Sequence, residues 1–304
     1  MSNAPTYTFN GTTYIAGGQD NNCTVSVCPV ELSVYGYRPS LPLSSVIIAL
    51  YVLSIIIQAF LGFRYKTWGF MTIMILGAVD EIIGYIGRIL MYNNPFEHSG
   101  FIIQIVLITI GPVFFSAAIY VMLSQIVNYI SVKHSRFQPS LFYWIFVPCD
   151  LVSLILQAVG GAMSSTSNGK SSVGVNVALA GLAFQVATLT IFSIVTIDYL
   201  IRSRAVWKAA SIPTRFKIFV SFLSLATLLI LARCCYRVYE LNEGYSRTST
   251  ALRDQPLFIG LETILIIVAA YCLIVAHPGP VFKADQKHLT YDEKDVRGSE
   301  STTV

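Results

Sequence analysis

The chain has 304 residues and a net charge of +4, with 54% hydrophobic and only 12% charged residues. Its mean hydropathy is +0.64. Because soluble domains are about 25% charged, this composition excludes an ordinary soluble protein and predicts a polytopic membrane protein.

Residues 1–42 precede the first long apolar run and are expected to form an extracellular segment. They contain two N-glycosylation acceptor sequences, at Asn10 and Asn22, which are modified only on the lumenal or extracellular side. Cys23 and Cys28 lie in the same segment, where the redox compartment permits a disulfide that closes a short loop. Residues 1–40 lack the basic start and apolar core of a cleavable signal peptide, so we expect the first span to direct insertion.

Seven apolar runs follow, each of about 20 residues or more, the length needed to cross the hydrocarbon core of a bilayer. They cover residues 43–63, 68–92, 101–130, 141–163, 173–201, 216–241 and 256–276. The sequence therefore predicts an all-α bundle of seven transmembrane helices over residues 43–277. Residues 278–304 are rich in charge and poor in apolar side chains, which predicts a disordered cytosolic tail.

The distribution of Lys and Arg predicts the orientation. With the N-terminus outside, 13 of the 20 basic residues lie in cytosolic segments and four lie outside, while Arg88, Arg233 and Arg237 lie within spans. This asymmetry follows the positive-inside rule. We therefore expect the N-terminus outside the cell and the C-terminus in the cytosol.

Charged side chains inside three spans fall on single helix faces. Charge at this depth is expensive and is by default a sign of function. In the second span the face carries Glu81, Tyr85 and Arg88, together with Gly77 and Gly84, whose lack of side chains permits close helix approach. The matching faces in later spans carry Asp150, Ser153 and Gln157 in the fourth, and Arg233, Tyr236, Arg237 and Glu240 in the sixth.

Depth within the membrane separates these groups. In the predicted topology Glu81 and Asp150 lie near the midplane, whereas Arg88, Arg233, Arg237, Glu240 and Glu262 of the seventh span lie in the outer half. Two interpretations remain open. The charges can form a buried ion-pair network that sets helix register, or they can line a hydrated path for an amphipathic substrate, since their number exceeds what register requires.

The sequence offers little for metal, nucleotide or catalytic chemistry. Its four histidines lie in loops, a tail or at a helix end, so no intramembrane zinc constellation can be assembled. The segment Gly169-Lys170-Ser171 resembles the end of a P-loop, but Ser164 stands where the first glycine is required. We expect no metal, no cofactor, no enzymatic activity, and neither a nucleotide nor a nucleic acid as partner.

Several strings of residues resemble the fungal lipid-translocating exporter family, also called RTA-like proteins. They are EIIGYIGR at 81–88, GPVFFSAAIY at 111–120, DLVSLILQAVGG at 150–161, RCCYRVYEL at 233–241 and HPG at 277–279. Within the family, the motifs of the fourth and sixth spans are most similar to the yeast exporters of sphingoid long-chain bases. One departure concerns the seventh span, where relatives tend to carry Glu and then Asp, and this chain has Gln255 and Glu262.

The resemblance implies a seven-span protein of the plasma membrane or an endomembrane. Such a protein is expected to move sphingoid bases or related amphiphiles, and so to contribute to lipid asymmetry and resistance to toxic amphiphiles. Membrane lipids are then the expected partners. On this view, Asp150 and Glu81 meet the cationic headgroup, and the outer arginines with Glu240 form an exit vestibule. The alternative is a seven-span lipid or stress sensor without transport activity, because topology alone does not separate the two.

Overall fold

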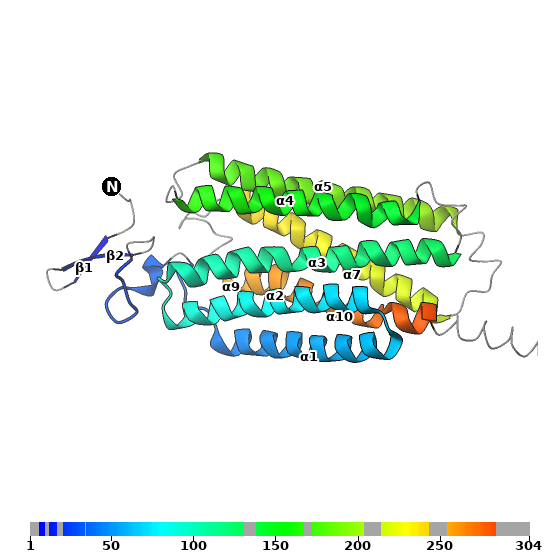
Figure 1. Cartoon of the computed structure of the whole chain (residues 1–304). Helices are drawn as coiled ribbons and strands as arrows, with labels where there is room; N and C mark the ends of the chain where they lie inside the picture. The colour runs from blue at the N-terminus through cyan, green and yellow to red at the C-terminus, as the bar shows by residue number, and fades with distance from the viewer. Residues whose placement is uncertain are drawn as a thin grey trace, which may run out of the picture.

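A computed structural model describes residues 6–9, 12–16, 21–33, 35–130, 138–166, 172–203, 214–242 and 254–283. It contains seven helices long and apolar enough to cross a membrane, arranged as an elongated bundle (Figure 1). The first six are α1 (Leu41–Tyr65), α2 (Trp68–Asn93), α3 (His98–Ile130), α4 (Pro139–Thr166), α5 (Ser172–Arg202) and α7 (Thr214–Asn242). The prediction of an all-α seven-span protein is confirmed.

The seventh span is one continuous rod built from three parts. It consists of α9 (Gln255–Phe258), the π-helical turn η3 (Ile259–Ile264) and α10 (Leu265–Val275). Asp254 caps the start of α9, because its side chain accepts a hydrogen bond from the Leu257 N–H at 3.3 Å. Hydropathy predicts the span but not the π turn, which changes the angular position of the side chains that follow it.

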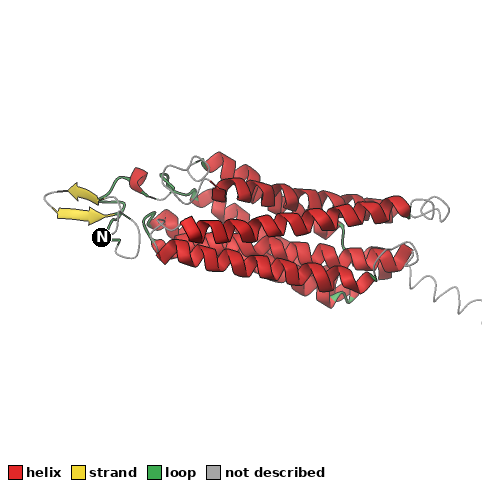
Figure 2. Ribbon diagram, turned by 90° about the horizontal axis from the view of Figure 1, so that it is seen from above, coloured by secondary structure: helices red, strands yellow, loops and turns green. Residues whose placement is uncertain are grey.

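The N-terminal segment contains a small sheet that the hydropathy pattern does not predict. Strand β1 (Thr6–Phe9) pairs antiparallel with β2 (Thr12–Ile15), with Thr6 opposite Ile15. Figures 1 and 2 show this hairpin beyond one end of the helices in two perpendicular views. Cys23 and Cys28 form a disulfide, as their spacing and predicted compartment permit.

The stretch that leads into α1 is attached to the connection between α2 and α3. The Asn21 side-chain amide donates to the carbonyl of Phe96 at 2.9 Å, and Arg38 Nε donates to the carbonyl of Tyr92 at 2.7 Å. The Arg38 guanidinium also lies over the Tyr92 ring, 3.9 Å from its centroid. The N-terminal segment therefore covers the end of the bundle at which α2 ends.

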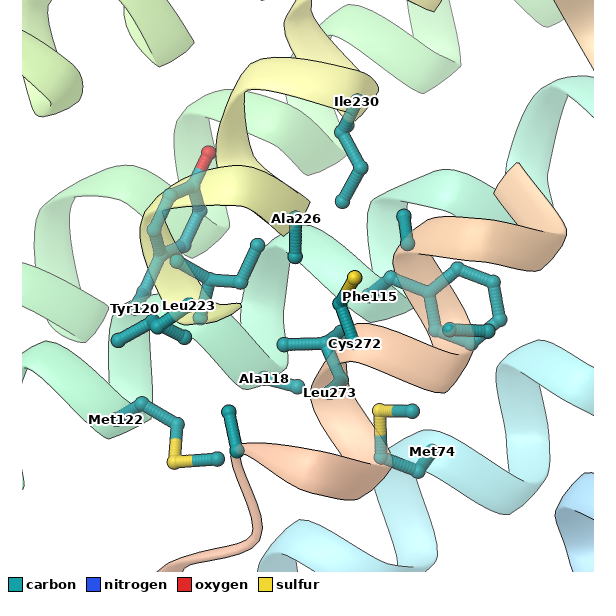
Figure 3. Close-up of a cluster of buried hydrophobic side chains, with 14 of the residues drawn as sticks. Met74, Phe115, Ala118, Tyr120, Met122, Leu223, Ala226, Ile230, Cys272 and Leu273 are labelled. Carbon is teal, nitrogen blue, oxygen red and sulfur yellow. The ribbon is translucent and has the colours of Figure 1, made fainter. Parts of the chain in front are cut away.

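The apolar core lies between α2, α3, α7 and α10. Figure 3 shows Met74, Phe115, Leu223 and Leu273, one from each of these helices, within one cluster of buried side chains. Small side chains such as Ala226, which is fully buried, let the helices approach closely. Helices α4 and α5 pack against each other along one side of this core, as Figure 1 shows.

Candidate polar site between the helices

A network of four charged side chains joins α7 to the π turn η3. Arg233 Nη2 lies 3.0 Å from Glu262 Oε1, and Arg237 Nη1 lies 2.5 Å from Glu240 Oε2 and 3.8 Å from Glu262 Oε1. Each of the four residues is at most 4% exposed. Because these residues are buried, each charge depends on its partner: a buried charge left without a partner raises the free energy of the folded state by several kcal/mol.

Local backbone structure positions this network. On α7, Arg233, Arg237 and Glu240 lie four and three residues apart, which places them on one helix face. On the seventh span, Glu262 lies inside the π turn, which places its carboxylate beside both guanidinium groups. Arg233 also donates to the carbonyl of Ile108 at 2.6 Å and so connects the network to α3.

Helix α2 contributes two further buried charges, Glu81 and Arg88, that form no ion pair with any described residue. Glu81 is 2% exposed and packs against Gly111 of α3, where an added Cβ would lie 2.5 Å from Glu81 Oε1. Arg88 is fully buried and donates to the Tyr37 hydroxyl at 3.1 Å. Tyr85 lies between these two residues in the sequence of α2, and its hydroxyl is 2.6 Å from Thr263 Oγ1 of η3.

Asp150 occupies a separate polar centre, between α3, α4 and α5. Its carboxylate accepts hydrogen bonds from the Tyr120 hydroxyl at 2.8 Å and the Thr188 hydroxyl at 3.2 Å, and the residue is 1% exposed. Among the residues that the structure describes, no cation pairs with it. Asp150 therefore lies outside the arginine network, which is paired by Glu240 and Glu262 instead.

A pair of amides continues this second centre. Gln157 Nε2 donates to Gln185 Oε1 at 3.0 Å and links α4 to α5. Gly181 of α5 allows the two helices to approach closely. A Cβ added there would lie 2.8 Å from the Ser153 carbonyl oxygen and 3.1 Å from the backbone nitrogen of Gln157. The polar face predicted on the fourth span therefore contacts side chains of α3 and α5 rather than the arginines of α7.

The structure adds polar residues that the sequence analysis did not select. Tyr120, Thr188 and Gln185 hold the Asp150 centre, while Gln58 on α1 is 0% exposed with neither side-chain atom hydrogen-bonded. Single Gln, Thr or Tyr residues in an apolar run give no charge signal. The sequence does not show that Tyr120, Thr188 and Gln185 face Asp150, because this depends on how α3 and α5 pack against α4.

His277 has a local structural role at the opposite end of the bundle. Its Nδ1 accepts a hydrogen bond from the Gly279 N–H at 3.0 Å, and its Nε2 lies 3.3 Å from Thr67 Oγ1. The ring also packs edge-on against Phe70, with centroids 5.3 Å apart. The described residues contain no group of three His, Cys, Asp or Glu side chains arranged to hold a metal ion.

Some predicted features fall outside the described residues. These are the Asn10 acceptor and most of the predicted tail, residues 284–304. The start of that tail is not disordered as predicted, because Gly279–Lys283 form a π-helical turn, η4. The second acceptor, Asn22, is described and exposed, and its Oδ1 accepts a hydrogen bond from the Ile15 N–H at 2.6 Å.

Fold and site together define a multi-pass membrane protein with buried charges between its helices, and comparison with known proteins identifies the family. A family model described as "RTA1 like protein" matches residues 74–285. The match covers most of the helical bundle, including both polar centres. The chain belongs to the RTA1-like family.

Of three relatives, two have names that refer to lipid transport. The sphingoid long-chain base transporter RSB1 of Saccharomyces cerevisiae is 28% identical over 256 residues, covering 72% of this chain and 66% of the relative. The lipid-translocating exporter-like protein RTA1 of Leptosphaeria maculans is 26% identical, covering 94% of this chain and 59% of the relative. Protein RTM1 of S. cerevisiae is 30% identical, covering 66% and 65%.

The matches span 66%, 65% and 59% of the lengths of RSB1, RTM1 and the exporter-like protein, respectively. Two of their names describe a transporter or an exporter rather than a catalyst. No solved structure matches the chain.

Proposed function

We propose that this protein moves sphingoid long-chain bases or related amphiphiles across the membrane, and so contributes to lipid asymmetry and to resistance to toxic amphiphiles. Support comes from membership of the RTA1-like family and from a relative named as a sphingoid base transporter. The observation that carries the proposal is the Asp150 centre, a buried carboxylate held by hydroxyl groups and without a cationic partner among the described residues.

The chemistry of Asp150 suits the headgroup of such a lipid. A sphingoid base carries one amine and neighbouring hydroxyl groups on a long apolar tail. An ammonium donates three hydrogen bonds and is stable away from water only beside a negative charge. Tyr120 and Thr188 each direct one hydroxyl at the Asp150 carboxylate, which leaves further lone pairs on its oxygens to accept from an amine.

The other buried charges complete the proposed path. Glu81 forms no ion pair with described residues, and we assign it, with Asp150, to contact with the cationic headgroup near the midplane. Gln157 and Tyr85 border these carboxylates on their own helices. Arg88, Arg233, Arg237, Glu240 and Glu262 are assigned to the exit vestibule in the outer half of the bundle.

The proposed topology places residues 1–42 outside the cell, residues 43–277 in the plasma membrane, and residues 278–304 in the cytosol. Support comes from the excess of basic residues on one side and from the disulfide between Cys23 and Cys28, which suits an oxidising compartment. Glycosidase treatment of the expressed chain tests it. A mobility shift that disappears in the variant Asn22→Gln, or in Asn10→Gln, places the segment outside. An N-terminal epitope tag that added protease cannot remove from intact cells would contradict this topology.

The transport proposal is tested by the substitution Asp150→Asn, which keeps size and removes charge. We expect cells with this variant to lose protection against added long-chain base while surface expression stays unchanged. The matched control is Asp198→Asn, because Asp198 forms an exposed pair with Arg202 at 3.1 Å near the end of α5. If cells with Asp150→Asn kept normal resistance to added long-chain base, the assignment of Asp150 to headgroup binding would be wrong.

Reconstitution separates a transporter from a sensor. The purified chain in liposomes is expected to move a labelled sphingoid base between leaflets, at a rate lowered by Asp150→Asn and not by Asp198→Asn. A properly folded chain that binds the label without moving it would favour the seven-span sensor instead.

A further inference from the structure

Arg88 is a fully buried cation whose hydrogen-bonding capacity is mostly unused. Its side chain is 0% exposed. One nitrogen, Nη2, donates to the Tyr37 hydroxyl at 3.1 Å, while Nε and Nη1 have no hydrogen-bond partner. The Arg88 guanidinium therefore offers N–H groups on two of its nitrogens, held in place but not used by the protein.

The Arg88 guanidinium lies among aromatic rings. The carboxylates of Glu240 and Glu262 act electrostatically on the neighbouring tyrosines but form no ion pair with Arg88. The guanidinium lies 4.1 Å from the ring centroid of Phe258 and 5.9 Å from that of Tyr35. Burial raises the pKa of both Tyr35 and Tyr37, outweighing the opposite effect of nearby Arg88, so both phenols stay uncharged. Cation–π contact offsets part of the cost of burial but supplies no counter-charge.

The contrast with the other two buried arginines shows what Arg88 lacks. Arg233 pairs with Glu262 at 3.0 Å, and Arg237 pairs with Glu240 at 2.5 Å. No carboxylate in the described part of the chain forms an ion pair with Arg88. A buried ion without a counter-ion costs several kcal/mol, and an anion that reaches Arg88 removes that cost.

Position narrows the kind of anion. Arg88 lies in the last two turns of α2, which ends at Asn93, and it is covered by the stretch of chain that contains Tyr35 and Tyr37. Beside it, Gln104 is 1% exposed and donates to the Tyr35 hydroxyl at 3.1 Å. The site is therefore close to one end of the bundle, beneath a short aromatic cover, and in the proposed topology this end lies near the lipid headgroups of the outer leaflet.

We propose that Arg88 binds a phosphate group, carried either by an anionic lipid of the outer leaflet or by free phosphate. Guanidinium matches phosphate in charge and in hydrogen-bond geometry. The incoming oxygens take the N–H groups of Nε and Nη1, while Nη2 keeps the Tyr37 hydroxyl, the one hydrogen-bond partner that Arg88 has among the described residues. The inference rests on the proposed function only in placing this end of the bundle at the outer leaflet.

The sign of this site differs from that of the Asp150 centre. Asp150 is a buried carboxylate suited to a cationic amine, and Arg88 is a buried cation suited to an anionic phosphate. Binding at Arg88 therefore recognises a different headgroup from the sphingoid base, or a second charged group on the same lipid. Binding and transport can be measured separately.

A ligand-dependent stability measurement on the purified full chain tests the site. The probes are dioctanoyl phosphatidic acid, the uncharged dioctanoylglycerol with the same chains, and inorganic phosphate, each titrated against the thermal unfolding midpoint in a zwitterionic detergent. We expect saturable stabilisation by phosphatidic acid and none by dioctanoylglycerol. In Arg88→Gln the apparent affinity is expected to fall about tenfold or more, which corresponds to at least about 1.4 kcal/mol.

Two further variants keep the result interpretable. Arg64→Gln removes an exposed arginine in the last turn of α1, far from Arg88 at the other end of the bundle. This variant is expected to bind phosphatidic acid like the unmodified chain. Arg88→Lys keeps the positive charge if Arg88→Gln fails to fold, and is expected to bind with reduced affinity because lysine donates from a single point.

Each outcome decides the inference. Stabilisation by phosphatidic acid alone supports a lipid headgroup site, and equal stabilisation by inorganic phosphate supports a site for the free anion. If neither phosphatidic acid nor inorganic phosphate stabilises the chain, the proposal is overturned. It is also overturned if the stabilisation is unchanged in Arg88→Gln or, where that variant does not fold, in Arg88→Lys. Because no transport is measured, failure of the proposed transport function does not produce any of these results.

Discussion

Glu262 is the single carboxylate shared by two buried arginines, so its substitution by Gln gives the most direct test of the ion network. Glu262 Oε1 lies 3.0 Å from Arg233 Nη2 and 3.8 Å from Arg237 Nη1. At an effective dielectric constant of about 20, these separations correspond to attractions of about 5.5 and about 4.4 kcal/mol. Loss of hydration by the buried groups offsets much of this gross attraction.

The net effect is expected to be smaller than the sum of those attractions but still large. Arg237 keeps Glu240 as a partner, whereas Arg233 loses its only carboxylate partner among the described residues. Removing one member of a buried pair costs about 3–5 kcal/mol. We therefore expect Glu262→Gln to lower the free energy of unfolding by about 3 kcal/mol or more.

The assay is reversible unfolding of the purified chain in mixed micelles with increasing SDS, followed by circular dichroism. Glu97→Gln, a substitution in the connection between α2 and α3, is the matched control and is expected to change stability by less than about 0.5 kcal/mol. Adding Arg233→Met to Glu262→Gln removes the stranded charge, so the double variant is expected to be more stable than the two single effects predict by at least about 1 kcal/mol.

Two results would refute this reasoning. The first is a cost below about 1 kcal/mol for Glu262→Gln, within the range of an exposed pair. The second is strict additivity of the Glu262 and Arg233 substitutions, which would mean that the two side chains do not depend on each other for stability. Either result would place water, rather than protein, as the main partner of Arg233.

Two further substitutions test the packing and the second polar centre. Gly111→Ala places a Cβ 2.5 Å from Glu81 Oε1, so we expect it to displace that carboxylate, to lower stability by about 1–3 kcal/mol and to lower sphingoid base movement in liposomes. Gly161→Ala is its control, because nothing lies within 4 Å of the added Cβ, and a similar loss in both variants would contradict the steric explanation. Tyr120→Phe removes one of two donors to the Asp150 carboxylate, and we expect unfolding in SDS micelles to require about 1–3 kcal/mol less free energy. An unchanged unfolding midpoint for Tyr120→Phe would indicate that this hydroxyl is replaced by water.

The bundle was predictable because each span carries its own signal. Hydropathy locates the seven runs, and every predicted boundary lies within three residues of a helix end in the structure. Helical spacing also predicts correctly that Arg233, Arg237 and Glu240 lie on one face. These properties depend on residues close in sequence, and the membrane leaves backbone groups few alternatives to the helix.

The partners of the charged residues were less predictable. The pairing of Arg233 with Glu262 depends on a π turn for which the hydropathy pattern gives no signal. The sequence left open that Asp150 balances an arginine, but the structure surrounds it with Tyr120 and Thr188 from two other helices. Spacing along one helix gives the direction of a side chain around that helix only, and does not say which helix lies opposite.

The sequence by itself determined the class of protein, the number of spans and the stripes of charge, because apolar length and helical periodicity are local properties. Tertiary structure alone decided that these stripes form two centres of opposite character. One is built around paired arginines, and the other around a carboxylate that has no cationic partner in the described part of the chain. It also decided that Arg88 is buried beneath Tyr37 and forms no ion pair with a carboxylate of the described residues. These outcomes follow from helix packing, which brings together side chains far apart in the sequence and sets the free energy of every buried charge through its neighbours.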